Sequence, residues 1–144
     1  MSSFPAGNTN LGIALLRLGL GTMWIAHALL KLLVFTLPDT AHYFASIGFP
    51  AWVAYPVFAA EMLGGLAIML GVYARQVSLA MAPLMAVVVF VHAPNGWVHT
   101  SPGGGWEYPA FLLVASLALW LAGDGAFSLR RSSRLVPTIQ GGAL

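Results

Sequence analysis

Long apolar stretches separated by short polar or turn-rich connections dominate the pattern along this chain. Four such stretches run roughly over residues 11–37, 51–73, 76–92 and 108–123. A helix needs about 20 apolar residues to cross the roughly 30 Å of hydrocarbon in a bilayer. The first two stretches reach that length, and the other two lie near or below its lower limit. The pattern predicts an all-α fold: an integral membrane four-helix bundle that forms one transmembrane domain over residues 1–144.

The composition supports a membrane protein and argues against several other classes. Hydrophobic residues make up 59% of the chain and charged residues only 7%, whereas a soluble domain carries about 25% charged residues. We therefore expect the lipid bilayer to solvate the apolar surface. Six Lys and Arg residues are too few for a nucleic-acid footprint, so we expect no nucleic acid. The chain has no cysteine, which excludes iron–sulfur clusters, thiolate metal sites and c-type haem attachment.

Positive charges are distributed unevenly between the connections. Arg75 follows the second stretch and three arginines cluster in 130–134, whereas the connections at 38–50 and 93–106 contain no Lys or Arg. The positive-inside rule places the arginine-bearing segments in the cytoplasm. With four crossings the N-terminus is also inside (N-in/C-in), and residues 124–144 form a cytoplasmic tail.

A few ionisable side chains interrupt or border the apolar stretches, and each is costly in a bilayer unless it is paired or hydrated. At about 1.5 Å per residue, His27 and His92 lie at similar depths in the outer half of the bundle. Lys31 is one turn from His27 on the same helix face, and Glu107 begins the fourth helix at the outer interface. Together these groups predict a polar pocket that opens outward and is lined by aromatic residues, including Trp106.

Two further charges lie deeper. Glu61 falls near the middle of the second helix, and Arg17 falls in the inner half of the first. We predict that Arg17 and Glu61 form a structural pair; the alternative is that Arg17 extends to the cytoplasmic headgroups. For each ionisable residue a purely structural or anchoring role stays open.

The two histidines also raise the question of a metal or haem. Bis-imidazole ligation of haem b is geometrically possible for two histidines at equal depth. However, no third ligand has a recognisable spacing, and no H-E-x-x-H motif appears. We therefore expect no metal and no haem.

An ordered set of motifs resembles the DoxX family over roughly residues 15–129. The motifs are Leu16-Arg17-Leu18, His27 with Lys31, Ala60-Glu61 with Gly64-Gly65, Gly71 with Arg75, Asn95-Gly96-Trp97, Gly103-Gly104-Gly105-Trp106-Glu107-Tyr108-Pro109 and Phe127-Ser128-Leu129. Ala28 is a departure, because related sequences often carry Gly there. The resemblance implies a multi-pass protein of the bacterial inner membrane. It also implies a role as a small membrane subunit, in a quinol oxidase and thiosulfate:quinone oxidoreductase context or in oxidative-stress membrane complexes.

Pocket and resemblance together suggest a membrane subunit of a respiratory or stress-linked oxidoreductase system that binds quinone or quinol on the periplasmic side. The candidate substrate-binding residues are His27, Lys31, His92 and Trp106, and the candidates for proton transfer are Glu61 and Glu107. Because the chain has no internal electron carrier, we expect a partner protein subunit or a homo-oligomer. Whether the chain is itself catalytic stays open. Two alternatives also stay open: a non-catalytic membrane anchor or assembly subunit, and a carrier for small solutes or protons.

Overall fold

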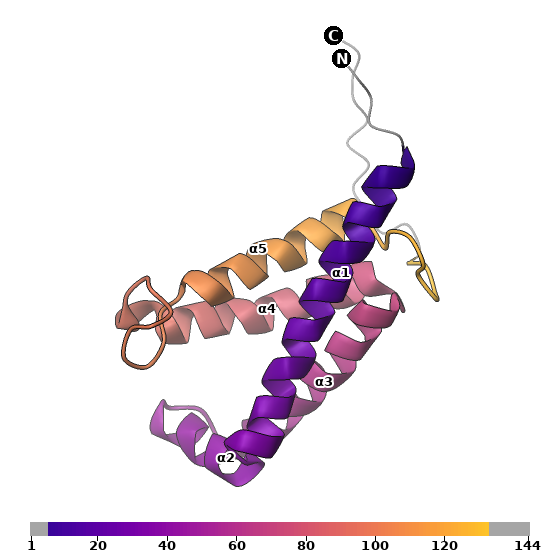
Figure 1. Ribbon diagram of the computed structural model, residues 1–144. Helices are drawn as coiled ribbons and strands as arrows, with labels where there is room; N and C mark the ends of the chain where they lie inside the picture. Colours follow the sequence, from indigo (N-terminus) through magenta and orange to yellow (C-terminus); the bar gives the residue numbers. More distant parts are fainter. Residues whose placement is uncertain (1–5, 133–144) are drawn as a thin grey trace.

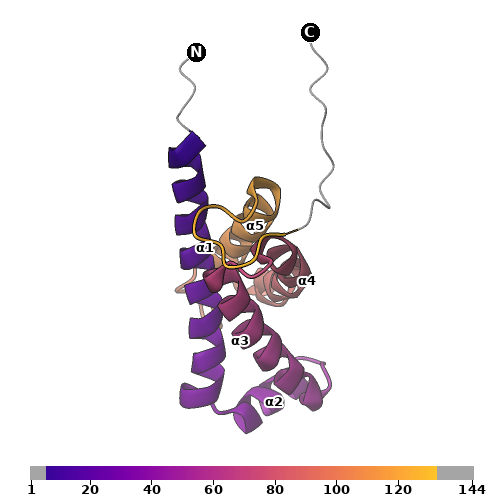
Figure 2. The same ribbon diagram turned by 90° about the vertical axis from the view of Figure 1, so that its right-hand side faces the viewer.

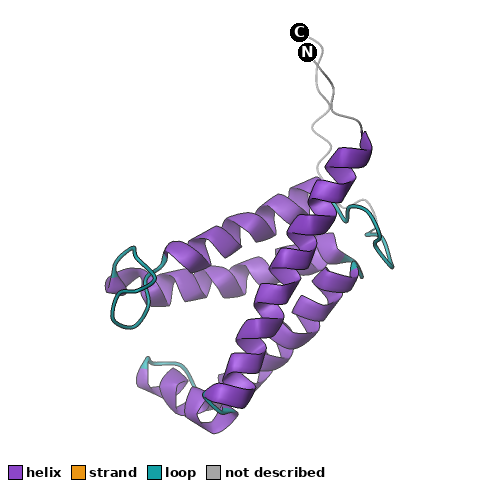
Figure 3. Cartoon of the chain, viewed as in Figure 1, coloured by secondary structure: helices purple, strands orange, loops and turns teal. Residues whose placement is uncertain are grey.

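The computed structural model describes residues 6–132 (Figure 1). Within this range every regular element is a helix, joined to the next by loops (Figure 3). The α-helices are α1 (Ala6–Leu29), α2 (Leu37–Ser46), α3 (Ala54–Leu70), α4 (Ala74–His92) and α5 (Glu107–Ala122). The predicted all-α fold is confirmed, and the four apolar stretches correspond to α1, α3, α4 and α5. The predicted cytoplasmic residues 133–144, Arg134 among them, lie outside the described range.

Within residues 6–132, three helical segments are long and apolar enough to cross a membrane: Gly7–Val34, Ala51–Leu70 and Ala74–Asn95. α5 is apolar but shorter, with 16 residues. At 1.5 Å per residue it is about 24 Å long, somewhat less than the hydrocarbon thickness. The lengths and apolar composition of these helices are those of a membrane protein.

The four long helices form two antiparallel pairs (Figures 1 and 2). α1 packs along α3, and α4 packs along α5. The pairs lie closest at the end where the turn after α3 leads into α4, and they diverge toward α2 and the loop at residues 93–106 (Figure 1). This divergence separates the outer halves of the two pairs.

Glycines allow α1 to approach α3 closely. A Cβ atom at Gly21 would lie 2.8 Å from the Gly65 carbonyl oxygen, and one at Gly65 would lie 2.9 Å from Cβ of Trp24. Lipid offers no hydrophobic force to drive helices together, so close packing of small residues is a main source of attraction. The glycine contact therefore fixes the α1/α3 pair and the depth of every side chain on it.

α2 is the main departure from the predicted fold, because residues 38–50 were expected to be a loop. The Thr36 hydroxyl accepts a hydrogen bond from the Asp39 backbone N–H at 3.3 Å and donates to the Asp39 carboxylate at 2.9 Å. A proline also stands in the first turn. Thr-x-x-Asp with an early proline is a helix start, so the residues that mark the end of the first apolar stretch also begin a new helix.

Residues 124–132 fold back across the end of the bundle where α1 begins. The Ala126 N–H donates to the Asn10 carbonyl and the Arg130 N–H to the Gly71 carbonyl, each at 3.0 Å. The predicted cytoplasmic tail begins at residue 124, and its residues 124–132, which we call the strap, pack against the bundle; their cytoplasmic location stays a prediction. The strap also shows that the start of α1 and the end of α5 lie at the same end of the bundle, as four crossings require.

Candidate functional site

A cavity of about 1860 Å³ lies between the two helix pairs. It extends to α2 and the loop at residues 93–106, and its walls are mostly aliphatic and aromatic. Five of the predicted site residues line it: His27, Lys31, Glu61, His92 and Glu107. The structure thus brings these residues into one space, as the sequence predicted, while their binding and proton-transfer roles stay predictions.

Lys31 and Glu61 form an ion pair across α1 and α3. The ammonium donates to both carboxylate oxygens, at 2.8 and 2.7 Å, and the two side chains are 17% and 4% exposed. Lys31 stands in a π-helical turn, Leu30–Val34, that continues α1. The predicted pairing of Arg17 with Glu61 is therefore wrong, because Lys31 neutralises Glu61.

Arg17 instead binds the strap. Its Nη1 donates to the Asp124 carbonyl at 2.8 Å and to the Ser128 hydroxyl at 2.7 Å, and the residue is 3% exposed. These acceptors lie just beyond the end of α5, so the strap gives this buried cation its hydrogen-bond partners. Gly71 packs against the guanidinium in a left-handed conformation (φ 70°), where a Cβ would collide with Nη1.

His27 and His92 each bond a backbone carbonyl of their own helix, four residues earlier. Nδ1 of His27 lies 2.8 Å from the Met23 carbonyl oxygen, and Nδ1 of His92 lies 2.9 Å from the Val88 carbonyl oxygen. A carbonyl can only accept, so Nδ1 carries the proton in both rings. In the neutral imidazoles Nε2 is then an acceptor, and within residues 6–132 neither Nε2 has a hydrogen-bond partner. The cavity wall therefore presents two acceptors from different helix pairs.

Tyr108 connects the first histidine to α5, and sequence reasoning did not single it out as a site residue. Its ring stacks on His27 with centroids 5.6 Å apart and planes 21° apart. Its hydroxyl donates to Sδ of Met23. The available signal was position, since Tyr108 begins the fourth apolar stretch at the depth estimated for His27.

Trp106 does not line the cavity, and the neighbouring Trp97 does. The two indole rings meet edge to face, 4.4 Å apart. The Trp106 N–H donates to the Gly96 carbonyl and the Glu107 N–H to the Trp97 carbonyl, at 3.1 and 3.0 Å. These bonds close the base of the loop with Trp97 on the cavity side, and the ligand-binding role of Trp106 stays a prediction.

Glu107 pairs with His99, a residue that sequence reasoning missed. One carboxylate oxygen accepts hydrogen bonds from the His99 backbone N–H and from its Nδ1, each at 2.8 Å. Glu107 stands on the loop side of the apolar stretch of α5. These two bonds hold the pKa of the Glu107 carboxyl below its ordinary value, and the bond from the His99 backbone N–H has the larger effect. Within the described residues no three His, Asp or Glu side chains gather as candidate metal ligands.

Comparisons with known proteins give the family of the chain. A family model described as DoxX matches residues 12–94. The chain is also similar to a protein of Bacillus subtilis (strain 168) named "Putative oxidoreductase CatD", with 29% identity over 120 residues that cover 83% of this chain and 84% of that protein. No solved structure matches the chain. The family match includes the Lys31–Glu61 pair and both cavity histidines.

Proposed function

The chain belongs to the DoxX family, and from this premise and the cavity geometry we propose that it is a membrane subunit of a quinone-linked oxidoreductase system. In this proposal it crosses the bacterial inner membrane four times, with the cavity facing the periplasm. The cavity holds the headgroup of a quinol or quinone. The name of the Bacillus subtilis relative supports a link to redox chemistry.

The observation that carries the proposal is the pair of Nε2 acceptors of His27 and His92. A hydroquinone has two hydroxyl donors on opposite sides of an apolar ring, and two acceptors that come from different helix pairs and line one largely apolar cavity suit this pattern. Such a ligand would bridge α1 and α4, which belong to different helix pairs. Tyr108, stacked on His27, would position the ring.

The proposal also names candidate groups for proton transfer and a route for the electrons. Glu107 with His99 stands at the loop end of the cavity, and Glu61 with Lys31 stands on the α1/α3 wall, so both carboxylates remain candidates for proton transfer. Because Glu61 offsets the charge of Lys31, we assign Lys31 to holding Glu61 in place rather than to binding the ligand. Electrons pass to a partner subunit or a soluble redox protein.

A binding measurement on the purified full-length chain tests the proposal. We expect a short-chain benzoquinol to bind the wild type, and His27→Ala and His92→Ala each to weaken binding five- to hundredfold. This range corresponds to a lost hydrogen bond of about 1–3 kcal/mol. His42→Ala is the matched control, because His42 is exposed on α2 and does not line the cavity. The control should bind as the wild type does.

The size of the cavity favours a second candidate function. Small-molecule pockets usually measure about 300–1000 Å³, and this cavity is larger. A helix of another membrane protein could fill it, which would make the chain a membrane anchor or assembly subunit. Absence of quinol binding by the well-folded protein, alone and with its partner, would overturn the first proposal and favour the second.

A further inference from the structure

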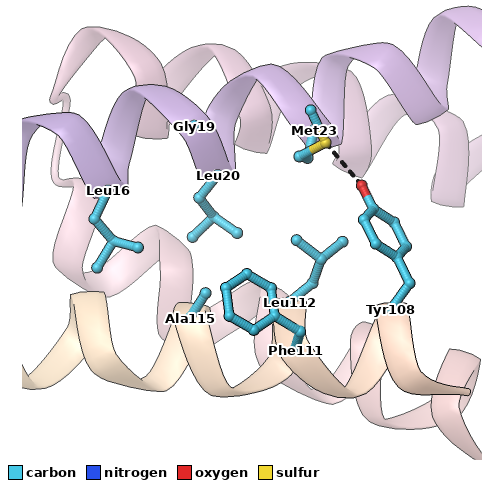
Figure 4. Close-up of a pocket in the computed structure, with 8 residues that line it drawn as sticks. All are labelled: Leu16, Gly19, Leu20, Met23, Tyr108, Phe111, Leu112 and Ala115. Carbon is cyan, nitrogen blue, oxygen red and sulfur yellow. Dashed lines mark hydrogen bonds between the residues drawn. The ribbon is translucent and has the colours of Figure 1, made fainter.

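A second, smaller space of about 250 Å³ lies between α1 and α5 (Figure 4). Its walls expose only apolar atoms. In Figure 4, Tyr108 stands at one end of this groove with its hydroxyl bonded to Met23, and Leu16 stands at the other. Seven residue steps separate Leu16 from Met23, so the groove is about 10 Å long.

The groove adjoins the large cavity. Four residues line both spaces: Met23, Tyr108, Phe111 and Leu112. Since the Tyr108 ring also stacks on His27, one side chain separates the proposed headgroup position from the start of the groove. From there the groove leads away from α2 and the loop, toward the middle of the membrane.

The groove also opens on the lipid-facing surface of the bundle. Gly19 is exposed, and a Cβ atom there would meet nothing within 4 Å. Phe111, on the α5 side, is 66% exposed. A hydrocarbon chain can therefore lie in the groove and continue into lipid, and the missing side chain of Gly19 leaves room for it.

We propose that the α1/α5 groove holds the hydrocarbon tail of the ligand whose headgroup lies in the large cavity. The ligand is then a lipid-soluble quinol or quinone with a long tail, not a small water-soluble one. This inference rests on the proposed function. It follows from three observations: the groove shares four lining residues with the headgroup cavity, its exposed walls are wholly apolar, and it runs toward the membrane interior.

Filling the groove tests the inference. Two benzoquinols with the same headgroup, one with a long alkyl tail and one with a methyl group in its place, are titrated onto the full-length chain in lipid nanodiscs. Gly19→Leu should weaken the tailed ligand about five- to hundredfold, the range expected for overpacking, and leave the tailless ligand unchanged. Gly19→Ala should give a smaller loss of the same kind.

Gly12→Leu is the matched control, because a Cβ at Gly12 also meets nothing within 4 Å and Gly12 lies outside the groove. Replacing Gly in a helix favours the helix, so all three variants should fold. Equal affinity of the tailed ligand for Gly19→Leu and Gly12→Leu would overturn the inference but leave the function standing, provided that the tailless ligand binds. Failure of both ligands to bind the wild type would overturn the function as well.

Discussion

The ammonium group of Lys31 donates to both carboxylate oxygens of Glu61, at 2.8 and 2.7 Å, and so ties the π-helical turn after α1 to α3. Removing one partner of a largely buried pair leaves an uncompensated charge, which costs about 3–5 kcal/mol. We therefore expect Lys31→Met to lower the free energy of unfolding by about that amount. Denaturant unfolding of the purified protein in detergent measures it.

A double variant, in which both Lys31 and Glu61 are replaced, distinguishes the energy of their interaction from the effect of losing each residue alone. Replacing a buried ion pair by apolar residues is often nearly neutral, so Lys31→Met combined with Glu61→Leu should be much more stable than Lys31→Met alone. Paired residues give such non-additive losses. If the losses simply add, the two side chains do not interact in solution.

The topology of the chain gives a second prediction, motivated by the arginines near the strap end of the bundle. The chain has no cysteine, so single cysteines can be introduced at Thr100, in the exposed loop between α4 and α5, and at Ser132, in the strap. An impermeant thiol reagent added to intact cells should label position 100 and not position 132. Labelling at 132 only would show that the bundle is inserted the other way round.

The helices could be predicted from sequence largely because hydrocarbon thickness fixes how long an apolar stretch must be. α2 was missed because its start at Thr36 and Asp39 coincides with the end of the first stretch, and because it is too short to cross the membrane. The capping signal is readable in the sequence, but it lies where the apolar stretch ends and a connection over residues 38–50 was expected.

The side-chain pairing was harder to predict, because depth along a helix says nothing about which face a residue occupies relative to its neighbours. Depth alone allowed Arg17 to reach Glu61, and only the packing of α1 on α3 shows that Lys31 has that place. Arg17 has its partners in the strap: the Ser128 hydroxyl and two backbone carbonyls, and backbone carbonyls carry no sequence signal.

The loop between α4 and α5 gives a pH prediction. Hydrogen bonds from His99 hold the pKa of Glu107 below its ordinary value of about 4.5. A carboxyl with a depressed folded-state pKa stabilises the fold above its unfolded pKa, and this contribution is lost as the pH falls through the folded value. We therefore expect the loop to loosen only below about pH 4.5, as seen in the fluorescence of Trp97 and Trp106.

Other acidic groups titrate in the same range, so the control is the difference between two proteins. Glu107→Gln keeps the size of the side chain and cannot ionise, and its loop fluorescence should lack this step. Asp39→Asn, which changes a carboxylate on α2, should retain the step. A step of equal size in Glu107→Gln would assign the transition to another group.

The last prediction concerns which redox form the cavity prefers. Nδ1 of His27 and of His92 is occupied by a carbonyl of its own helix, so each neutral ring offers the cavity only an acceptor. A quinol hydroxyl can donate to an acceptor, whereas a quinone carbonyl needs a donor. We expect the reduced form of a short-chain benzoquinone to bind about tenfold more tightly than the oxidised form, the equivalent of roughly one hydrogen bond. Because glutamine offers both a donor and an acceptor, His27→Gln and His92→Gln should each narrow this preference, while the exposed His42→Gln leaves it unchanged. Titrations of both redox forms under controlled potential measure the ratio. A wild-type protein that binds the two forms equally, or variants that keep the full preference, would show that the histidine acceptors do not contact the headgroup.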